Sequence, residues 1–154
     1  MNTAVALARL GGYDFGFLRD RFDYDYPQFA GQFSKAVTEL KKFYELIVVG
    51  VRPLANMSKL VDAAWHTHVN HTPQYRQFCD AVNGGYIDHQ PHSEATPVPA
   101  EAIGNFYTQY VGRFGQVPQV WLEDIPQNLV PAVMRGGVPA ELTRMRWSGW
   151  PGRG

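Results

Sequence analysis

The sequence has little of several features that would point to particular classes of protein. Its single cysteine, Cys79, excludes an internal disulfide framework. Charge of one sign is not in excess, because 14 Lys and Arg residues balance 14 Asp and Glu residues. No net field therefore attracts a nucleic acid or an anionic membrane surface. Apolar runs such as 46–49 are far shorter than the ~20 residues of a membrane-spanning helix. We expect neither nucleic acid nor a membrane as a partner.

The N-terminal residues do not form a secretory signal, because no basic stretch precedes an apolar run and a small-residue cleavage site. The sequence thus predicts an intracellular, cytoplasmic protein or a component of a virion. Its composition, 45% hydrophobic and 18% charged, is typical of ordered globular proteins. A chain of 154 residues is long enough for one domain with its own core.

Helical periodicity dominates the centre of the chain. Over 27–49, apolar residues recur at steps of three and four, which indicates a helix with one buried face. Ser58 is a suitable N-cap for a helix over about 59–69. Thr72 and the proline after it begin another short helix, which ends before Gly84. The sequence therefore predicts a mainly α, compact helical domain built around a central helical hairpin.

A long proline-containing loop is expected over 86–99, because three prolines there prevent a regular helix. A further helix is predicted over 100–113, where Val111 falls among the residues expected to be buried. Beyond Trp121 the regular spacing of apolar residues fades.

Both ends of the chain are interpreted as arms attached to a helical core of residues 27–124. The first arm, 1–26, is rich in Asp, Tyr, Phe and Arg towards its end. The second, 125–154, contains four prolines and carries four arginines against one glutamate, so it has a net positive charge. Trp and Arg dominate the energetics of many interfaces, so this extended arm is expected to bind a partner. The candidate partner-binding residues are Arg135, Arg144, Arg146, Trp147 and Trp150.

All five histidines and the only cysteine lie within 27 positions. Imidazole and thiolate are preferred ligands of zinc, so this clustering raises the hypothesis of a zinc site. On a continuous helix, however, His66 and His68 are separated by about 200° and cannot bind one ion unless the helix unwinds. The candidate metal ligands are His66, His68, Cys79 and His89, with Asp62 supporting His66 from one turn away.

The alternative interpretation of the same residues is structural. A histidine among apolar neighbours is often a buried ring whose nitrogens are hydrogen-bonded, and a lone cysteine often acts as a small apolar side chain. Trp65, Tyr75 and Phe78 are expected in the core. No phosphate-binding glycine loop, metalloprotease pair or nucleophile elbow occurs in the sequence, so no catalytic residue is assigned.

The centre of the chain resembles bacterial relatives of the glycine-rich domain-containing protein-like family. The resemblance spans about 30–121 and rests on the pattern V-D-x-x-W-H-x-H, then T-x-x-Y-x-x-F-C, H-x-P and a later Y-x-x-x-F-G. It departs from that pattern at Asp88, where a second histidine is common, and at Ala55–Asn56, where a Pro-Ser turn is expected. The matching residues are Val61, Asp62, Trp65, His66, His68, Thr72, Tyr75, Phe78, Cys79, Gly85, His89, Pro91, Tyr110, Phe114, Gly115, Pro118 and Trp121. The resemblance implies a helical fold and a shared His/Cys centre, and no particular reaction.

Three functions are compatible with these patterns. The favoured one is a non-enzymatic structural or interaction protein, a small adaptor subunit that docks into a larger assembly, such as a virion or tail, through its arms. The second is a metal-dependent hydrolase-like enzyme that uses the His/Cys residues. The third is a peptide- or ligand-binding module, which would require an open groove lined by Tyr and Trp.

Overall fold

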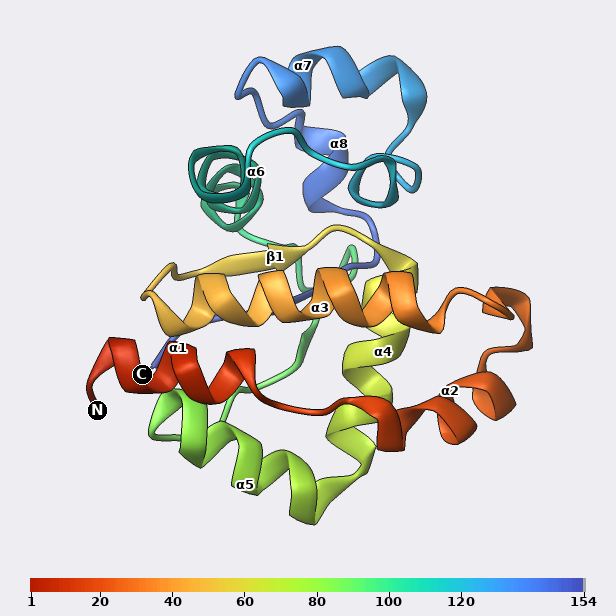
Figure 1. Cartoon of the computed structure of the whole chain (residues 1–154). Coiled ribbons are helices and arrows are strands. Elements are labelled where there is room, and N and C mark those ends of the chain that lie inside the picture. The colour runs from red at the N-terminus through yellow and green to blue at the C-terminus, as the bar shows by residue number, and fades with distance from the viewer. Residues whose placement is uncertain (154) are drawn as a thin grey trace. The chain divides into compact units, whose positions relative to one another are not determined.

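Helices make up most of the chain, as the apolar periodicity predicts, and the expected mainly α fold class is confirmed. The structure is a computed structural model that describes residues 1–153 (Figure 1). The chain divides into two compact units. Unit 1 contains residues 1–50 and 60–87, and unit 2 contains 51–59 and 88–154. This division differs from the expected core of 27–124 with an arm at each end.

All regular secondary-structure elements of unit 1 are helices. Its α-helices are α1 (Thr3–Gly11), α2 (Arg19–Asp25), α3 (Phe33–Val48), α4 (Lys59–Asn70) and α5 (Thr72–Asn83). Helix α1 packs against both α3 and α5. Two hydrogen bonds fasten it there: Arg9 donates to the carbonyl of Ala81 over 3.1 Å, and Lys41 donates to that of Gly11 over 2.8 Å.

The N-terminal segment 1–26 is therefore part of unit 1, which corrects the expectation of an arm or lid. The side chains of Leu10, Leu18 and Phe22 are fully buried or nearly so. Asn2 caps α1, because its side-chain oxygen accepts hydrogen bonds from the backbone N–H groups of the first turn. The helices here are too short for their periodicity to stand out, and tertiary packing stabilises them.

The predicted helices of the centre agree with α3, α4 and α5, including the hairpin. Helix α3 begins at Phe33, later than expected, because Pro27–Phe29 forms a separate 3-10 turn and Gly31 follows with a φ of 78°. At the other end of the hairpin, α5 stops at Gly84, which has the left-handed φ of 66° that favours glycine.

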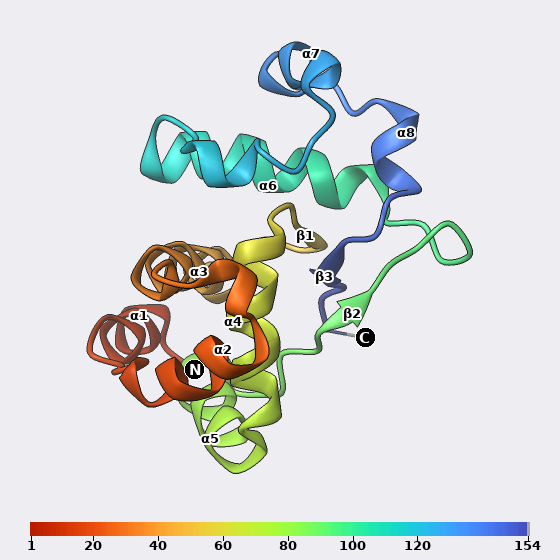
Figure 2. The ribbon, with the colours of Figure 1, turned by 90° about the vertical axis from the view of Figure 1, so that its right-hand side faces the viewer.

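The described residues of unit 2 form a small sheet, three α-helices and two short 3-10 helices. The strands are β1 (Leu54–Asn56), β2 (Gln90–Pro91) and β3 (Ser148–Trp150), and the helices are α6 (Ala100–Phe114), α7 (Val130–Met134) and α8 (Ala140–Thr143). The sheet is antiparallel with the order β1-β3-β2, so the last strand in sequence lies in the middle (Figure 2). Strand β1 also packs closely against α6.

The C-terminal segment does not form an extended arm. Trp147 and Trp150 are only 6% and 3% exposed, and β3 pairs with both other strands. The indole N–H of Trp147 donates to the carbonyl of Leu142 over 2.8 Å. At Gly149, an added Cβ would lie 2.7 Å from the carbonyl oxygen of Leu54, so the close pairing of β3 with β1 requires glycine. The pairing of β3 with β1 joins residues more than ninety positions apart, which no local periodicity reveals.

Within the described residues, no helix combines the length and apolarity that crossing a membrane requires.

Candidate functional site

His68, a candidate metal ligand, is fully buried between two tyrosines. Its Nε2 lies 3.1 Å from the hydroxyl of Tyr13, and its Nδ1 lies 2.7 Å from the hydroxyl of Tyr44. A neutral imidazole has one donor and one acceptor nitrogen, so one hydroxyl donates to the ring and the other accepts from it. Both ring nitrogens are thus occupied within unit 1.

The surroundings of His68 keep its imidazole neutral. Aromatic rings surround it, including those of Phe15, Tyr75 and Phe78, each within 5.5 Å between ring centroids. Desolvation by burial, with a smaller effect from His71, lowers the pKa of His68 to about 3. Burial likewise raises the pKa of Tyr13 to about 12, aided by Cys79 and Asp14. Near neutral pH this cluster is an uncharged hydrogen-bonded core.

Removal of the Tyr44 hydroxyl tests this arrangement. The Tyr44→Phe variant leaves Nδ1 of His68 without its partner in a fully buried position. We expect the free energy of unfolding to fall by about 1–3 kcal/mol, the cost of an unsatisfied buried polar group. Chemical denaturation measures it, with Tyr24→Phe as the control because Tyr24 is exposed. Equal stabilities of the two variants would contradict the proposed role of this hydrogen bond.

His66 is on the exposed side of α4, and its Nδ1 lies 3.0 Å from the hydroxyl of Tyr26. The pKa of Tyr26 is raised, mainly by desolvation and further by the charges of Asp62 and Asp25. His66 and His68 therefore contact different tyrosines, as expected for residues two positions apart on an unbroken helix. The helix does not unwind at His68, so these two imidazoles do not converge on one ion.

Cys79 is fully buried on α5, where its sulfur accepts a hydrogen bond from the backbone N–H of Ile87 over 3.4 Å. His89 belongs to unit 2 and lies in the loop before β2. Among residues 1–153, no three His, Cys, Asp or Glu side chains are grouped so as to hold a metal ion. The zinc hypothesis for His66, His68, Cys79 and His89, with Asp62 in support, thus lacks an assembled site.

The expected core role of Trp65, Tyr75 and Phe78 is confirmed. All three are at most 2% exposed. The indole of Trp65 donates to the hydroxyl of Tyr75 over 3.0 Å, and that hydroxyl donates to the carbonyl of Ile87 over 2.6 Å. This chain of hydrogen bonds connects α4 to α5 and to the residue that ends unit 1. The conspicuous Trp/His/Tyr/Cys pattern is mainly a pattern of core packing.

The candidate partner-binding residues divide into two groups. Arg135, Arg144 and Arg146 are exposed, as expected of residues that bind a partner. Trp147 and Trp150 are buried in unit 2 and do not present their indoles to a partner. Their burial corrects the expectation for the two tryptophans, since indoles gain more from the core of unit 2 than from water.

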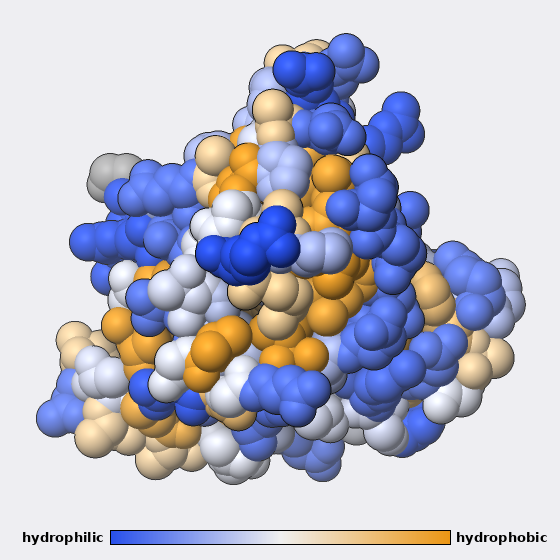
Figure 3. Space-filling model, turned by 90° about the horizontal axis from the view of Figure 1, so that it is seen from above, coloured by the Kyte–Doolittle hydropathy of each residue, from blue (hydrophilic) through white to orange (hydrophobic). Residues whose placement is uncertain are grey.

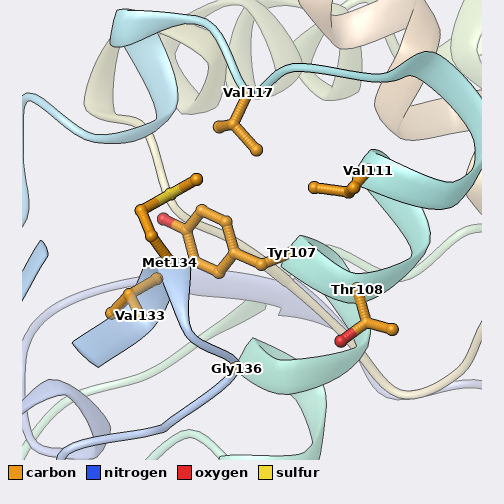
Figure 4. Close-up of a pocket in the computed structure, with 7 residues that line it drawn as sticks. All are labelled: Tyr107, Thr108, Val111, Val117, Val133, Met134 and Gly136. Carbon is orange, nitrogen blue, oxygen red and sulfur yellow. The ribbon is translucent and has the colours of Figure 1, made fainter. Parts of the chain in front are cut away.

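A hollow between α6 and α7 is a concave apolar feature that sequence reasoning missed. Its volume is about 200 Å³. We call it the α6–α7 hollow, and it is lined by Tyr107, Thr108, Val111, Val117, Val133, Met134 and Gly136. The side chains of Val111, Val117 and Met134 point into the open space (Figure 4). The hydroxyl of Tyr107 donates to the carbonyl of Trp121 over 2.6 Å, so its ring alone faces the hollow.

Two of these side chains are unusually exposed for apolar residues. Val111 is 49% exposed and Met134 is 47% exposed. The periodicity of α6 placed Val111 on the buried face, since it lies four positions after Tyr107. In the structure Val111 is half exposed and lines the hollow together with Val133 and Met134 of α7. The sequence alone does not show how far along α6 other residues cover its apolar face.

Charges of both signs belong to the surroundings of the hollow. Arg135 stands between the lining residues Met134 and Gly136 in the sequence and is exposed. The pKa of the lining residue Tyr107 is raised by burial and further by the carboxylate of Asp124. Viewed from the side of α6 and α7, the surface shows orange apolar areas beside blue hydrophilic ones (Figure 3).

Comparison with known proteins gives one family. The UCP032817-like family matches residues 10–102, which is more than half of the chain. The resemblance to the glycine-rich domain-containing protein-like family is therefore wrong. The V-D-x-x-W-H-x-H segment lies inside the matched residues, but a pattern dominated by core packing did not identify the correct family. No curated protein and no solved structure matches the chain.

Proposed function

The chain belongs to the UCP032817-like family, and we propose that it is a non-enzymatic interaction protein, a small subunit of a larger protein assembly. The observation that carries this proposal is the α6–α7 hollow, an apolar depression with exposed Val111 and Met134 at its edge. A virion or tail is one assembly in which such a subunit would serve. The proposed docking surface is a face of the folded unit 2, because the C-terminal segment is packed into that unit and does not form an extended arm.

The physical support comes from what such a hollow does in water. Exposed apolar surface beside charged residues marks sites of protein association, because burying it releases about 25 cal/mol per Å². Energetic hot spots cluster where one large side chain fills a pocket on the partner. The α6–α7 hollow has room for one such side chain, and the exposed Arg135, which stands between the lining residues Met134 and Gly136, is suited to a polar rim.

The hydrolase-like alternative has weaker support, because two of its candidate residues have structural partners inside unit 1. His68 is held between Tyr13 and Tyr44 in a setting that keeps it neutral, and Cys79 accepts a backbone hydrogen bond in the core. A nucleophile or metal ligand must instead reach a substrate or an ion.

A single charge placed at the edge of the hollow tests the proposal. In the Val111→Glu variant, a carboxylate replaces an apolar side chain that is 49% exposed, so the fold tolerates it but an apolar partner does not. In extracts of the native source, we expect the tagged wild-type chain to elute as a complex much larger than 17.4 kDa, and the variant to elute alone.

The matched control is Gln109→Glu, which adds the same charge at an exposed position of α6 outside the hollow. This variant should remain in the complex, and thermal unfolding should show that both variants are folded. A wild-type chain that elutes at 17.4 kDa, or a Val111→Glu chain that stays in the complex, would refute the proposed function.

A further inference from the structure

A second concave feature of unit 2 lies where the first turn of α6 meets strands β1 and β3. Its volume is about 230 Å³. It is lined by residues at these three elements and by His92, which follows β2 in the chain. We call it the β3–α6 pocket. It shares no lining residue with the α6–α7 hollow.

Most of the lining of the β3–α6 pocket is apolar. Leu54, Ala102, Trp150 and three prolines make up six of its eight lining residues. A cavity of about 150 Å³ holds benzene, so a volume of about 230 Å³ has room for one aromatic ring with a short substituent. Drug-sized ligands require pockets of about 300 Å³ or more. The size and lining therefore favour a small ligand with one ring.

The charge that lines the β3–α6 pocket is negative. Glu101, in the first turn of α6, is the one charged residue of its lining, and it is exposed. Among residues 1–153, no Lys or Arg forms an ion pair with its carboxylate. Arg52 is not a lining residue, and its aliphatic stem lies against Gly152. Trp150 lines the same pocket, and an indole is the aromatic group that attracts cations best.

His92 adds a hydrogen-bond acceptor to this lining. Its Nδ1 lies 3.3 Å from the carbonyl oxygen of Thr96, and a carbonyl only accepts, so Nδ1 carries the proton. Burial lowers the pKa of His92, against the opposing effect of that hydrogen bond, which keeps the ring neutral near pH 7. Nε2 is then an acceptor. The backbone N–H of His92 donates to the carbonyl of Trp147 over 2.8 Å and holds the residue beside β3.

We propose that the β3–α6 pocket binds a small primary amine that carries one aromatic ring. The ring packs against Trp150 and the other apolar residues of the lining, and the ammonium group donates to the Glu101 carboxylate, with Nε2 of His92 as a second acceptor. An ammonium group has three donors, so it can satisfy both. This ligand site is separate from the docking role of the α6–α7 hollow, and neither depends on the other. We expect a Kd of about 0.1–1 mM, because the ligand is small and an exposed ion pair contributes little.

Titration of the purified full chain with phenethylamine, followed by NMR of the four indole N–H signals, tests the proposal. The signal of Trp150 is identified by its absence from the spectrum of a Trp150→Phe variant. It should shift and saturate, whereas the signals of Trp65 and Trp121, which do not line the pocket, should stay in place. The comparison ligand is 3-phenylpropionate, which has the same ring but a carboxylate. It should bind about tenfold more weakly or worse, because Glu101 repels it.

Glu101→Gln removes the charge but keeps the shape of the side chain. We expect it to weaken phenethylamine binding by about fivefold, the upper end for an exposed ion pair. Glu94→Gln is the matched control, because Glu94 is exposed and lies outside the pocket, and it should bind like the wild type. Thermal unfolding should show that both variants are folded, since Glu101 also suits the helix dipole at the start of α6.

Three results would overturn the amine site: a Trp150 signal that does not shift at about 10 mM phenethylamine, tenfold above the weakest expected Kd; 3-phenylpropionate that binds as tightly; or equal affinities of Glu101→Gln and the wild type. Nα-acetyl-lysine amide has the same ammonium group on a chain without a ring, so it should bind more weakly than phenethylamine. Tighter binding of this compound would also contradict the proposal, and it would point to a lysine side chain of a protein partner as the occupant.

Discussion

Replacement of Trp150 by alanine is expected to lower the free energy of unfolding by about 3–5 kcal/mol, the usual cost of removing a buried large aromatic side chain. Trp150 is 3% exposed and ends β3, where it pairs with Leu54 of β1. Because β3 is the middle strand, the loss affects the packing of the whole three-stranded sheet. A loss of this size is a large fraction of the stability of a typical domain.

Urea denaturation followed by circular dichroism measures this effect. Arg153→Ala is the matched control in the same C-terminal segment, because Arg153 is exposed and its loss should change stability by less than about 0.5 kcal/mol. A Trp150→Ala variant as stable as Arg153→Ala would mean that the segment is an arm after all, outside the core of unit 2.

A second large effect is expected in acid, where His68 makes stability depend on pH. Its pKa is about 3 in the folded protein, compared with about 6.5 in an unfolded chain, because burial disfavours the imidazolium. Between these two values the unfolded state binds a proton that the folded state does not. The contribution is therefore fully present above pH 6.5, and it decreases by about 1.4 kcal/mol for each unit as the pH falls towards 3.

Unfolding measured at a series of pH values from 7 to 4 checks this expectation against a His68→Gln variant. Glutamine has a donor and an acceptor for Tyr13 and Tyr44 but does not titrate. The variant is expected to be less stable than the wild type at pH 7 and to lose less stability on acidification. His66→Gln, which changes an exposed imidazole, should follow the wild type. Parallel pH curves for the wild type and His68→Gln would refute the buried, neutral state of His68.

The clustered histidines and cysteine show why residue type alone was a poor guide to function here. In the sequence, His68 and Cys79 look like ligands, because imidazole and thiolate bind zinc. In the structure, each makes hydrogen bonds inside unit 1, with tyrosine hydroxyls for His68 and a backbone N–H for Cys79. The structural alternative needs only one satisfied partner for each polar atom, whereas a metal site needs several side chains at one point.

Local signals explain the parts of the fold that could be predicted. The apolar steps of three and four gave α3 and α6, the Thr72–Pro73 start and the Gly84 stop gave α5, and Ser58 marked the start of α4. Helices follow from such patterns because their hydrogen bonds join residues four positions apart. The core positions of Trp65, Tyr75 and Phe78 follow from the same periodicity.

The sequence by itself determined the mainly α class, the central hairpin and the buried face of each long helix, since all three depend on neighbours within a few residues. Only the tertiary structure decided that β3 pairs with β1, that Trp147 and Trp150 belong to a core, and that Val111 lies at the edge of a hollow. It also decided that His68 binds Tyr13 and Tyr44. Each of these outcomes depends on groups that are far apart in the chain, and their meeting is set by the packing of the whole unit, which local spacing does not encode.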